Sequence, residues 1–274
     1  MQRSMLLYIH GTREEKNVSS LTCGPSEGPQ LMPSLQPPVF IVLPVYNRRE
    51  TTRIFCDSLR EQTYRDFVLI LVDDGCRDGT PEMVHGYPFP TAICRGNGSL
   101  WWAGALRKGM ARLAALGPRP DDLVMWVNDD VSFESRFLER AVQEIQHFGQ
   151  GVLLSVPVGN CGAGCYVCDW PGFTFRGYGR HPERVDCAST RCVLAHYGDL
   201  SRCGAFRPRL LPHYLSDYEY TIRARRAGLR IVPAESICCI APREPAARLG
   251  LEAASGAEIL RRPTDSVRPS SASP

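Results

Sequence analysis

The chain has 274 residues, of which 43% are hydrophobic and 22% charged, and its formal net charge is +3. These values are ordinary for a soluble globular protein, and so weak and dispersed a positive charge does not favour nucleic-acid binding. No apolar run approaches the roughly 20 residues that a membrane-spanning helix needs, and the N-terminal segment lacks the apolar centre of a signal peptide. We therefore expect a cytoplasmic protein.

The first half of the chain alternates predicted strands with predicted helices. Residues 1–38 have little periodicity and predict a disordered leader, which leaves Met1 and Met32 both open as the start of translation. Strands are predicted at 39–45, 67–72, 91–94, 123–127 and 152–156, and helices at 51–62, from Pro81, at 102–113 and at 137–148. This alternation predicts an α/β fold with a Rossmann-like, mostly parallel sheet flanked by helices. Neither GxGxxG nor a P-loop is present, so a dinucleotide-binding domain is not supported.

The second half is less regular. Residues 159–179 are rich in Gly, Cys and aromatic residues and predict loops over a functional site. A helix is predicted at 216–227, ended by Gly228, followed by a strand at 229–232 that resumes at 237–240. Residues 242–274 predict a low-complexity, largely disordered tail with at most a weak helix at 249–260. The predicted folded domain is therefore 39–241.

Twelve cysteines leave three interpretations open. Disulfides would suit a secreted protein, whereas Cys56, Cys76 and Cys94 fall in or beside the predicted core, where buried single thiols are common. A zinc site is the second interpretation, although its spacing matches no regular zinc motif; it would draw on Cys161, Cys165 and Cys168, with Cys187, Cys192 and Cys203. Free thiols are the simplest interpretation.

Carboxylates follow two of the predicted strands directly. Asp73 and Asp74 end the second strand, and Asn128-Asp129-Asp130 ends the fourth. Adjacent carboxylates repel each other unless a cation lies beside them, and Mg²⁺ and Mn²⁺ prefer carboxylate oxygens. Open parallel sheets bind ligands at this edge, so the pattern predicts a metal–phosphate site, with a solvated turn as the alternative.

Four motifs in this order resemble glycosyltransferase family 2 over roughly residues 39–233. They are Ile41-Val-Leu-Pro-Val-Tyr-Asn47, Val72-Asp-Asp-Gly-Cys-Arg-Asp-Gly-Thr80, Asn128-Asp-Asp130 and the helix start Ser216-Asp-Tyr-Glu-Tyr-Thr-Ile-Arg223. The resemblance implies the GT-A fold and an inverting reaction. The segments 98–105 and 211–219 are similar to a rhamnosyltransferase-like bacterial branch of that family.

The resemblance implies a role for each matching residue on the donor side. Asp129 would face the ribose, and Asp130 would bind the Mn²⁺ or Mg²⁺ that bridges the diphosphate and neutralises the leaving group. Asp74 would hydrogen-bond the nucleobase, with Asp73 beside it. The other predicted nucleotide-sugar-binding residues are Pro44, Val45, Tyr46, Asn97, Trp102 and Asn128. Trp101 and Trp102 are consistent with an apolar wall for a 6-deoxy sugar.

An inverting reaction also needs a base that deprotonates the acceptor hydroxyl, and the family match assigns it to Asp217. A helix N-terminus favours an ionised carboxylate there, although a simple helix cap is an alternative explanation. Glu219 and His213 are predicted on the acceptor side. Glu219 and Arg223 are four residues apart, so a structural ion pair also explains them, and His213 is also compatible with a structural or solvated role.

The chain departs from the family pattern at four places. Ser216 replaces the usual acid before the base, Asn128 replaces the first Asp of its triplet, and Arg107 stands where many relatives have Asn. No His follows residues 237–240, where many relatives have one near the diphosphate.

The sequence thus predicts a metal-dependent inverting glycosyltransferase for glycan, cell-envelope polysaccharide or lipid-linked saccharide synthesis. We expect a UDP- or dTDP-linked sugar donor, a glycan or lipid-linked acceptor, and peripheral membrane association where that acceptor lies. The alternatives are a nucleotide-sugar-binding protein with impaired catalysis and a zinc-stapled, Cys-rich interaction module.

Overall fold

The computed structural model describes residues 36–159, 163–169 and 174–241, so the predicted disordered tail, nearly all of the leader and Cys161 lie outside the described residues. A seven-stranded sheet in the order β10-β5-β9-β4-β1-β2-β3 forms the centre. Its strands are β1 (Val39–Val45), β2 (Phe67–Asp73), β3 (Thr91–Arg95), β4 (Leu123–Val127), β5 (Val152–Ser155), β9 (Cys192–His196) and β10 (Arg230–Pro233). The helices are α1 (Arg49–Arg60), α2 (Thr80–His85), α3 (Trp101–Ala115), α4 (Phe137–Phe148), α5 (Tyr197–Cys203) and α6 (Ser216–Arg226).

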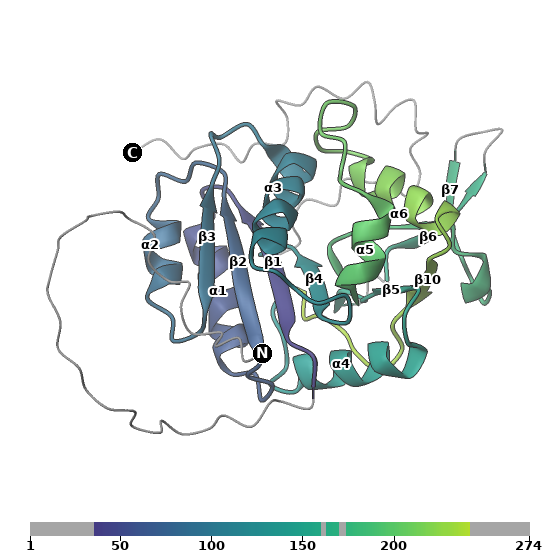
Figure 1. Ribbon diagram of the computed structural model, residues 1–274, viewed down its shortest axis with the longest axis horizontal. Helices are drawn as coiled ribbons and strands as arrows, with labels where there is room; N and C mark the ends of the chain where they lie inside the picture. The colour runs from purple at the N-terminus through teal and green to yellow at the C-terminus, as the bar shows by residue number, and fades with distance from the viewer. Residues whose placement is uncertain (1–35, 160–162, 170–173, 242–274) are drawn as a thin grey trace, which may run out of the picture.

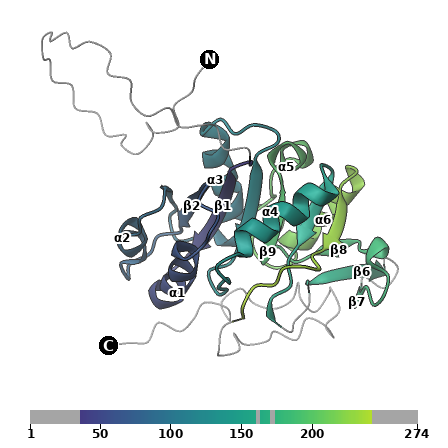
Figure 2. The same ribbon diagram turned by 90° about the horizontal axis from the view of Figure 1, so that it is seen from below.

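Helices cover both faces of this sheet. The side chains of β1 alternate between the two faces, so that Ile41 and Leu43 pack with α1 and α4, whereas Phe40 and Val42 pack with α3. The same face as α3 carries α5 and α6, and Figure 2 shows α1 and α3 on opposite sides of β1 and β2. The predicted fold class, an α/β fold with a mostly parallel sheet between helical layers, is confirmed.

The order of the strands reverses direction beside β1. The chain passes from β1 to β2 and β3 on one side, and then returns to place β4 on the other side of β1. Such a switch point opens a crevice at the carboxyl ends of the two strands, and open α/β sheets bind ligands there. The predicted segments 46–49 and 128–130 both begin at this edge (Figure 1).

Local sequence explains where α6 begins and ends. Asp217 and Glu219 lie in its first turn and Arg223, Arg225 and Arg226 in its last, which suits the helix dipole. Gly228 has φ 101°, and the N–H groups of Gly228 and Leu229 donate to the carbonyl oxygens of Arg225 and Ala224. This pair of bonds is a Schellman motif, so the predicted stop at Gly228 is confirmed.

The prediction of loops over 159–179 is wrong for its described part. β6 (Cys165–Asp169) pairs with both β7 (Thr174–Gly177) and β8 (Cys187–Ala188) in a separate antiparallel sheet, which Figure 1 shows at the far end from α2. The Gly, Cys and aromatic composition obscured this hairpin, because β-propensity reflects packing on neighbouring strands more than the backbone itself.

The structure differs from the predicted strands at two further places. β9, which was not predicted, runs antiparallel between β4 and β5 and is buried along its whole length. Residues 237–240 form no strand; Cys239 and Ile240 each make one isolated bridge, to Val158 and Ser132. A buried central strand has no polar face, so the short run 192–196 carries no alternation that would have revealed it.

The cysteines of the described chain are free thiols. Burial raises the pKa of Cys165 to about 12 and also raises the pKa of Cys187, so both side chains stay protonated. The described residues hold no group of three or more His, Cys, Asp or Glu placed to bind a metal ion, so they give no support to a zinc site. Cys161, the remaining member of the suggested cluster, lies outside them.

Across the described ranges, no helix is both long enough and apolar enough to cross a membrane.

Candidate functional site

The loops that follow β1 and β2 are tied to each other. The backbone N–H of Arg77 donates to Asn47 Oδ1 at 2.8 Å, and the N–H of Arg49 donates to Asp78 Oδ2 at 2.9 Å. Asp73 is buried, and its Oδ1 accepts the N–H groups of Gly75 (3.0 Å) and Cys76 (2.7 Å). This bonding fixes the turn after β2, so Asp73 holds the loop in shape.

Asp74 binds the loop that leads into α3. Its Oδ1 accepts the N–H of Gly98 at 2.9 Å, and its Oδ2 accepts those of Leu100 (3.0 Å) and Trp101 (3.3 Å). A Cβ at Gly96 would lie 2.5 Å from Asp74 Oδ1, so only glycine fits there. Asp74 therefore anchors the start of α3 with both carboxylate oxygens.

Pro44, Val45 and Tyr46 lie at the carboxyl end of β1, beside the end of β2. Val45 is buried, and the ring of Tyr46 approaches Gly98. The Asn97 side chain accepts the N–H and the hydroxyl of Ser99, at 3.1 and 2.8 Å. The predicted base-recognition segments are thus adjacent, and Asn97 stabilises its own turn.

The two carboxylates after β4 each contact one arginine. Asp129 Oδ1 lies 3.0 Å from Arg48 Nη1, and its Oδ2 accepts the hydroxyl of Thr52 at 3.0 Å. Burial raises the pKa of Asp129 to about 6, although Arg48 and Thr52 oppose that rise. Asp130 contacts Arg191 through both oxygens, at 3.3 Å to Nε and 3.1 Å to Nη2. The predicted triplet thus lies in a concentrated, internally balanced charge cluster.

The residues of this cluster suit a hard divalent cation. Mg²⁺ is usually held by one or two carboxylates, with substrate phosphates and waters completing its shell. Asp130 supplies such a carboxylate, and next to it Asn128 Oδ1 is buried without a hydrogen-bond partner. These oxygens, together with a bound diphosphate, make an acceptable donor set.

Asn128 also lines a cavity of about 270 Å³. Small-molecule sites are usually about 300–1,000 Å³, so this volume suits one sugar unit and not a whole nucleotide sugar. The other lining residues come from α3, β6, the loop between β8 and β9, and the start of α6: Trp102, Tyr166, Ser189, Thr190, Arg191, His213, Tyr214, Leu215, Asp217 and Tyr218. Four residues predicted from sequence therefore share one cavity.

Asp217 lies in the wall of this cavity, in the first turn of α6. Its Oδ1 accepts the N–H of Tyr218 at 3.0 Å. Burial raises the pKa of Asp217 to about 6, opposed by hydrogen bonds from the backbone of Thr190 and the hydroxyl of Ser189. A carboxylate of this pKa is mostly ionised at pH 7 and is still a competent proton acceptor.

The two predicted acceptor-side residues differ in placement. His213 lines the cavity, its Nδ1 is buried without a partner, and desolvation lowers the pKa of its ring. Glu219 is instead paired with Arg223 (3.0 Å) and Arg207 (3.3 Å), which matches the structural ion pair considered from sequence. His213 thus has a free hydrogen-bonding atom at the site, whereas Glu219 is engaged in holding α6.

The structure adds a loop that sequence reasoning missed, residues 189–191 between β8 and β9. Besides its contacts with Asp217 and Asp130, this loop receives the indole N–H of Trp102 on Thr190 Oγ1 at 2.9 Å. Its short polar sequence carries no recognisable motif. Arg48, by contrast, had a signal, because it sits in the turn that directly follows the first predicted strand.

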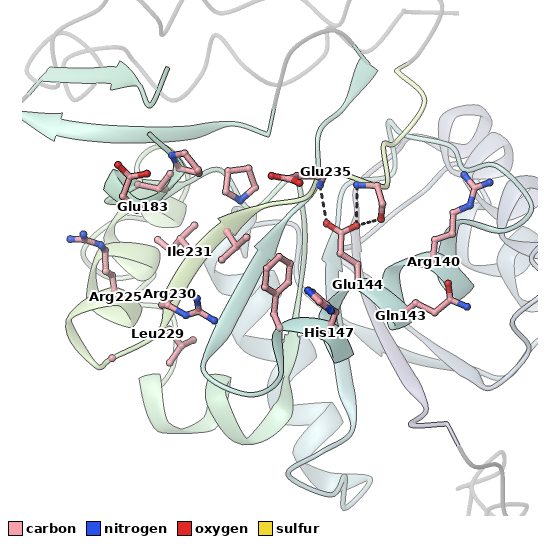
Figure 3. A pocket seen from close by; sticks show the side chains of 17 residues that line it. Arg140, Gln143, Glu144, His147, Glu183, Arg225, Leu229, Arg230, Ile231 and Glu235 are labelled. Atoms are coloured by element: carbon pink, nitrogen blue, oxygen red, sulfur yellow. Dashed lines mark hydrogen bonds between the residues drawn. The ribbon is translucent and has the colours of Figure 1, made fainter. Parts of the chain in front are cut away.

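A second cavity, of about 1,240 Å³, lies along β10, between α4 and η2 (Pro182–Arg184). Figure 3 shows Glu144 there, hydrogen-bonded to the backbone N–H groups of Glu235 and Ser236. Its lining includes no predicted site residue and no residue of the smaller cavity. The carboxylate cluster is therefore the stronger candidate site.

Comparison with known proteins agrees with this geometry. The family model for glycosyl transferase family 2 matches residues 40–193, more than half of the chain. An uncharacterised glycosyltransferase of Haemophilus influenzae is 28% identical over 108 residues, which are 39% of this chain and 34% of that protein. The chain thus spans about a third of the length of this relative.

Two solved structures show the fold. A mannosyltransferase of Pyrobaculum calidifontis, in complex with GDP-Man and Mn²⁺, has a TM-score of 0.58 at 18% identity, covering 78% of this chain and 59% of that one. S. aureus TarS 1–349, in complex with UDP-GlcNAc, has a TM-score of 0.56 at 14% identity, covering 79% and 61%. The GT-A fold is confirmed. The rhamnosyltransferase-like branch stays a prediction. With its family motifs on the edge of a GT-A sheet, the chain belongs to glycosyl transferase family 2.

Proposed function

We propose that the protein is a metal-dependent inverting glycosyltransferase that moves a sugar from a nucleoside-diphosphate donor to a hydroxyl acceptor. The observation that carries the proposal is the shared cavity, which Asn128, two residues before the proposed metal ligand, lines together with Asp217. Inversion needs these two functions on opposite sides of one sugar. A UDP- or dTDP-linked donor and a glycan or lipid-linked acceptor are our working assignments.

On this proposal Asp130 would hold the metal, which would supply Lewis-acid stabilisation of the negative charge on the leaving diphosphate. The chain's own residues do the rest. The strand-end loops of β1 and β2 receive the base, and Trp102 and His213 bound the sugar-sized cavity. Asp217 takes the proton of the acceptor hydroxyl as that oxygen attacks the anomeric carbon. The bond to the diphosphate breaks, and the nucleotide leaves.

A thermal-shift panel of nucleotide sugars, with and without Mn²⁺, tests this proposal. We expect one donor class to raise the unfolding temperature only when Mn²⁺ is present. Asp130→Ala should abolish this metal-dependent rise in the unfolding temperature. A panel in which no nucleotide stabilises the protein would contradict the proposal. Donor binding without transfer or donor hydrolysis would instead favour the alternative, a nucleotide-sugar-binding protein with impaired catalysis.

A zinc-stapled module is tested separately. A transition-metal chelator such as 1,10-phenanthroline should leave the unfolding temperature unchanged, because Cys165, Cys168 and Cys187 are buried free thiols. A large fall in that temperature, reversed by added zinc, would revive the zinc interpretation.

A further inference from the structure

We infer that Arg191 is a built-in competitor of the metal, which occupies the oxygens of Asp130 and is released to the diphosphate when metal and nucleotide bind together. The inference rests on the proposed function and deepens it, because it predicts how the two ligands depend on each other. It assigns a role to a residue outside the family motifs on which the site was predicted.

The geometry makes Arg191 and a metal ion mutually exclusive on Asp130. The guanidinium contacts both carboxylate oxygens, Oδ1 at 3.3 Å and Oδ2 at 3.1 Å. The Asp130 side chain is only 10% exposed, so few directions of approach remain. A cation that binds these oxygens must therefore push the guanidinium aside. Two-point arginine–carboxylate pairs are among the stronger polar contacts, so this displacement is costly.

Displacement is mechanically simple because only the side chain needs to move. The backbone of Arg191 is fixed at both polar groups: its carbonyl oxygen accepts the N–H of Asn128 at 2.9 Å, and its own N–H donates to Ser189 Oγ at 3.4 Å. The side chain is 29% exposed, so it has room to turn toward a ligand in the crevice. The loop that holds Asp217 is therefore undisturbed.

A released guanidinium needs another anion, since a partly buried and unpaired charge is unfavourable. The planar fork of arginine matches phosphate as well as carboxylate. A nucleoside diphosphate bound beside the metal supplies that anion. Metal alone must therefore break the Arg191–Asp130 pair without compensation, whereas metal together with nucleotide exchanges one pair for another. Positive coupling between the two ligands follows.

The neighbouring pair does not have the same role. Asp129 is engaged by Arg48 on one oxygen and by the Thr52 hydroxyl on the other. Loss of Arg48 therefore leaves Asp129 with a partner, and the family match places Asp129 toward the ribose. Among the residues that the structure describes, only Arg191 contacts both oxygens of the residue assigned to the metal.

Isothermal titration calorimetry of the full chain with MnCl₂ alone, with UDP alone and with both measures the coupling. We expect Arg191→Gln to bind Mn²⁺ alone about tenfold more tightly than wild type. The factor by which Mn²⁺ raises the affinity for UDP should fall by about the same amount, since couplings of roughly 5–150-fold are typical. Arg225→Gln is the matched control. This substitution removes the ion pair between Arg225 and Asp186. Because Arg225 lines the other cavity, the affinities for Mn²⁺ and for UDP should stay at wild-type values.

Each outcome decides the matter. Unchanged or weaker Mn²⁺ binding by Arg191→Gln, with normal UDP–Mn²⁺ binding by wild type, overturns the inference and leaves the proposed function intact. Absence of metal-dependent binding of UDP, dTDP and GDP alike in wild type contradicts the proposed function itself; if dTDP or GDP binds in place of UDP, that nucleotide is used in the same titrations. If Arg191→Gln does not fold, Arg191→Lys decides, because it keeps the charge but loses the fork, and its affinity for Mn²⁺ alone should still rise.

Discussion

The site joins two regions that balance the carboxylates of the proposed chemistry in different ways. In the donor region, the loops after β1, β2 and β4, each acidic side chain is already bound: Asp74 by backbone N–H groups, Asp129 by Arg48, and Asp130 by Arg191. In the acceptor region, at the start of α6, Asp217 is held by hydrogen bonds from the N–H of Tyr218 and from Ser189 and Thr190. Arginines thus balance the two carboxylates after β4, whereas hydrogen bonds balance the proposed base.

The contrast also holds between Asp129 and Asp217. Burial raises the pKa of each to about 6, but Asp129 has the cation Arg48 beside it, whereas hydrogen bonds alone oppose the rise at Asp217. An ionised Asp217 is thus kept in an unfavourable environment. That is costly for folding and useful for a base, and four predictions test the difference.

The largest expected effect separates the two acids at the start of α6. Asp217→Asn should reduce transfer by about 10²–10⁴-fold, the usual contribution of a general base, with donor affinity nearly unchanged. Glu219→Gln, the matched control, should change transfer by less than about threefold, because Glu219 pairs with Arg207 and Arg223 outside the cavity. Initial rates of transfer and donor titrations on both variants measure these effects. Equal losses of transfer rate in the two variants would contradict the different roles assigned to Asp217 and Glu219.

The pH dependence of transfer should report the same carboxylate. A base must be ionised to accept a proton, so the rate should fall about tenfold per pH unit below the pKa of Asp217, which burial raises to about 6, and be flat above it. The profile of kcat/KM between pH 4.5 and 8.5 measures this. A rate that stays constant down to pH 4.5 would show that another group takes the proton.

Removing Arg48 should reveal how the donor region balances its charge. At pH 8, Arg48→Gln should lower the free energy of unfolding by about 1–3 kcal/mol, because the ionised Asp129 loses a charged partner in a buried place. At pH 5 the loss should be smaller, since Asp129 is then protonated. Urea unfolding at both pH values measures the difference. A pH-independent loss would point to packing in place of charge.

The smallest expected effect is a gain in the free energy of unfolding. Burial raises the pKa of Asp217 to about 6, above the 3.8 of an unperturbed Asp side chain, so the folded state binds the proton more tightly. The resulting stability is present below about pH 4 and is lost as the pH rises toward 6. Asp217→Asn should therefore raise the free energy of unfolding by about 1 kcal/mol at pH 7 and have little effect at pH 4. A loss of stability at pH 7 would show that Asp217 chiefly stabilises the first turn of α6.

Sequence reasoning located the strands and strand-end loops of the donor region, because that region is built from consecutive strand–loop–helix units. The hydrophobic runs that end at Asp73 and at Asn128 mark both the strands and the polar residues that follow them. The acceptor region was different. β9 is short and buried on both faces, and β6 pairs with β7 and β8, which both follow it in the chain, so neither carries a local periodic signal.

The contacts between regions were also beyond reach. Arg191 is 61 residues from Asp130 in the chain, and no sequence pattern near either residue predicts their ion pair. Glu219 and Arg223 show the reverse case, since a spacing of four on one helix was enough to predict their ion pair. Motifs therefore located the carboxylates, and only the folded chain showed which cations balance them.

The stereochemistry of transfer tests the central claim most directly, which is that Asp217 activates an acceptor for a single attack across from the metal-bound leaving group. Once the panel has identified the donor, proton NMR of the first-formed product gives its anomeric configuration. The account predicts that the configuration is inverted relative to the donor, and that Asp217→Asn forms no such product. A product with retained configuration would contradict it.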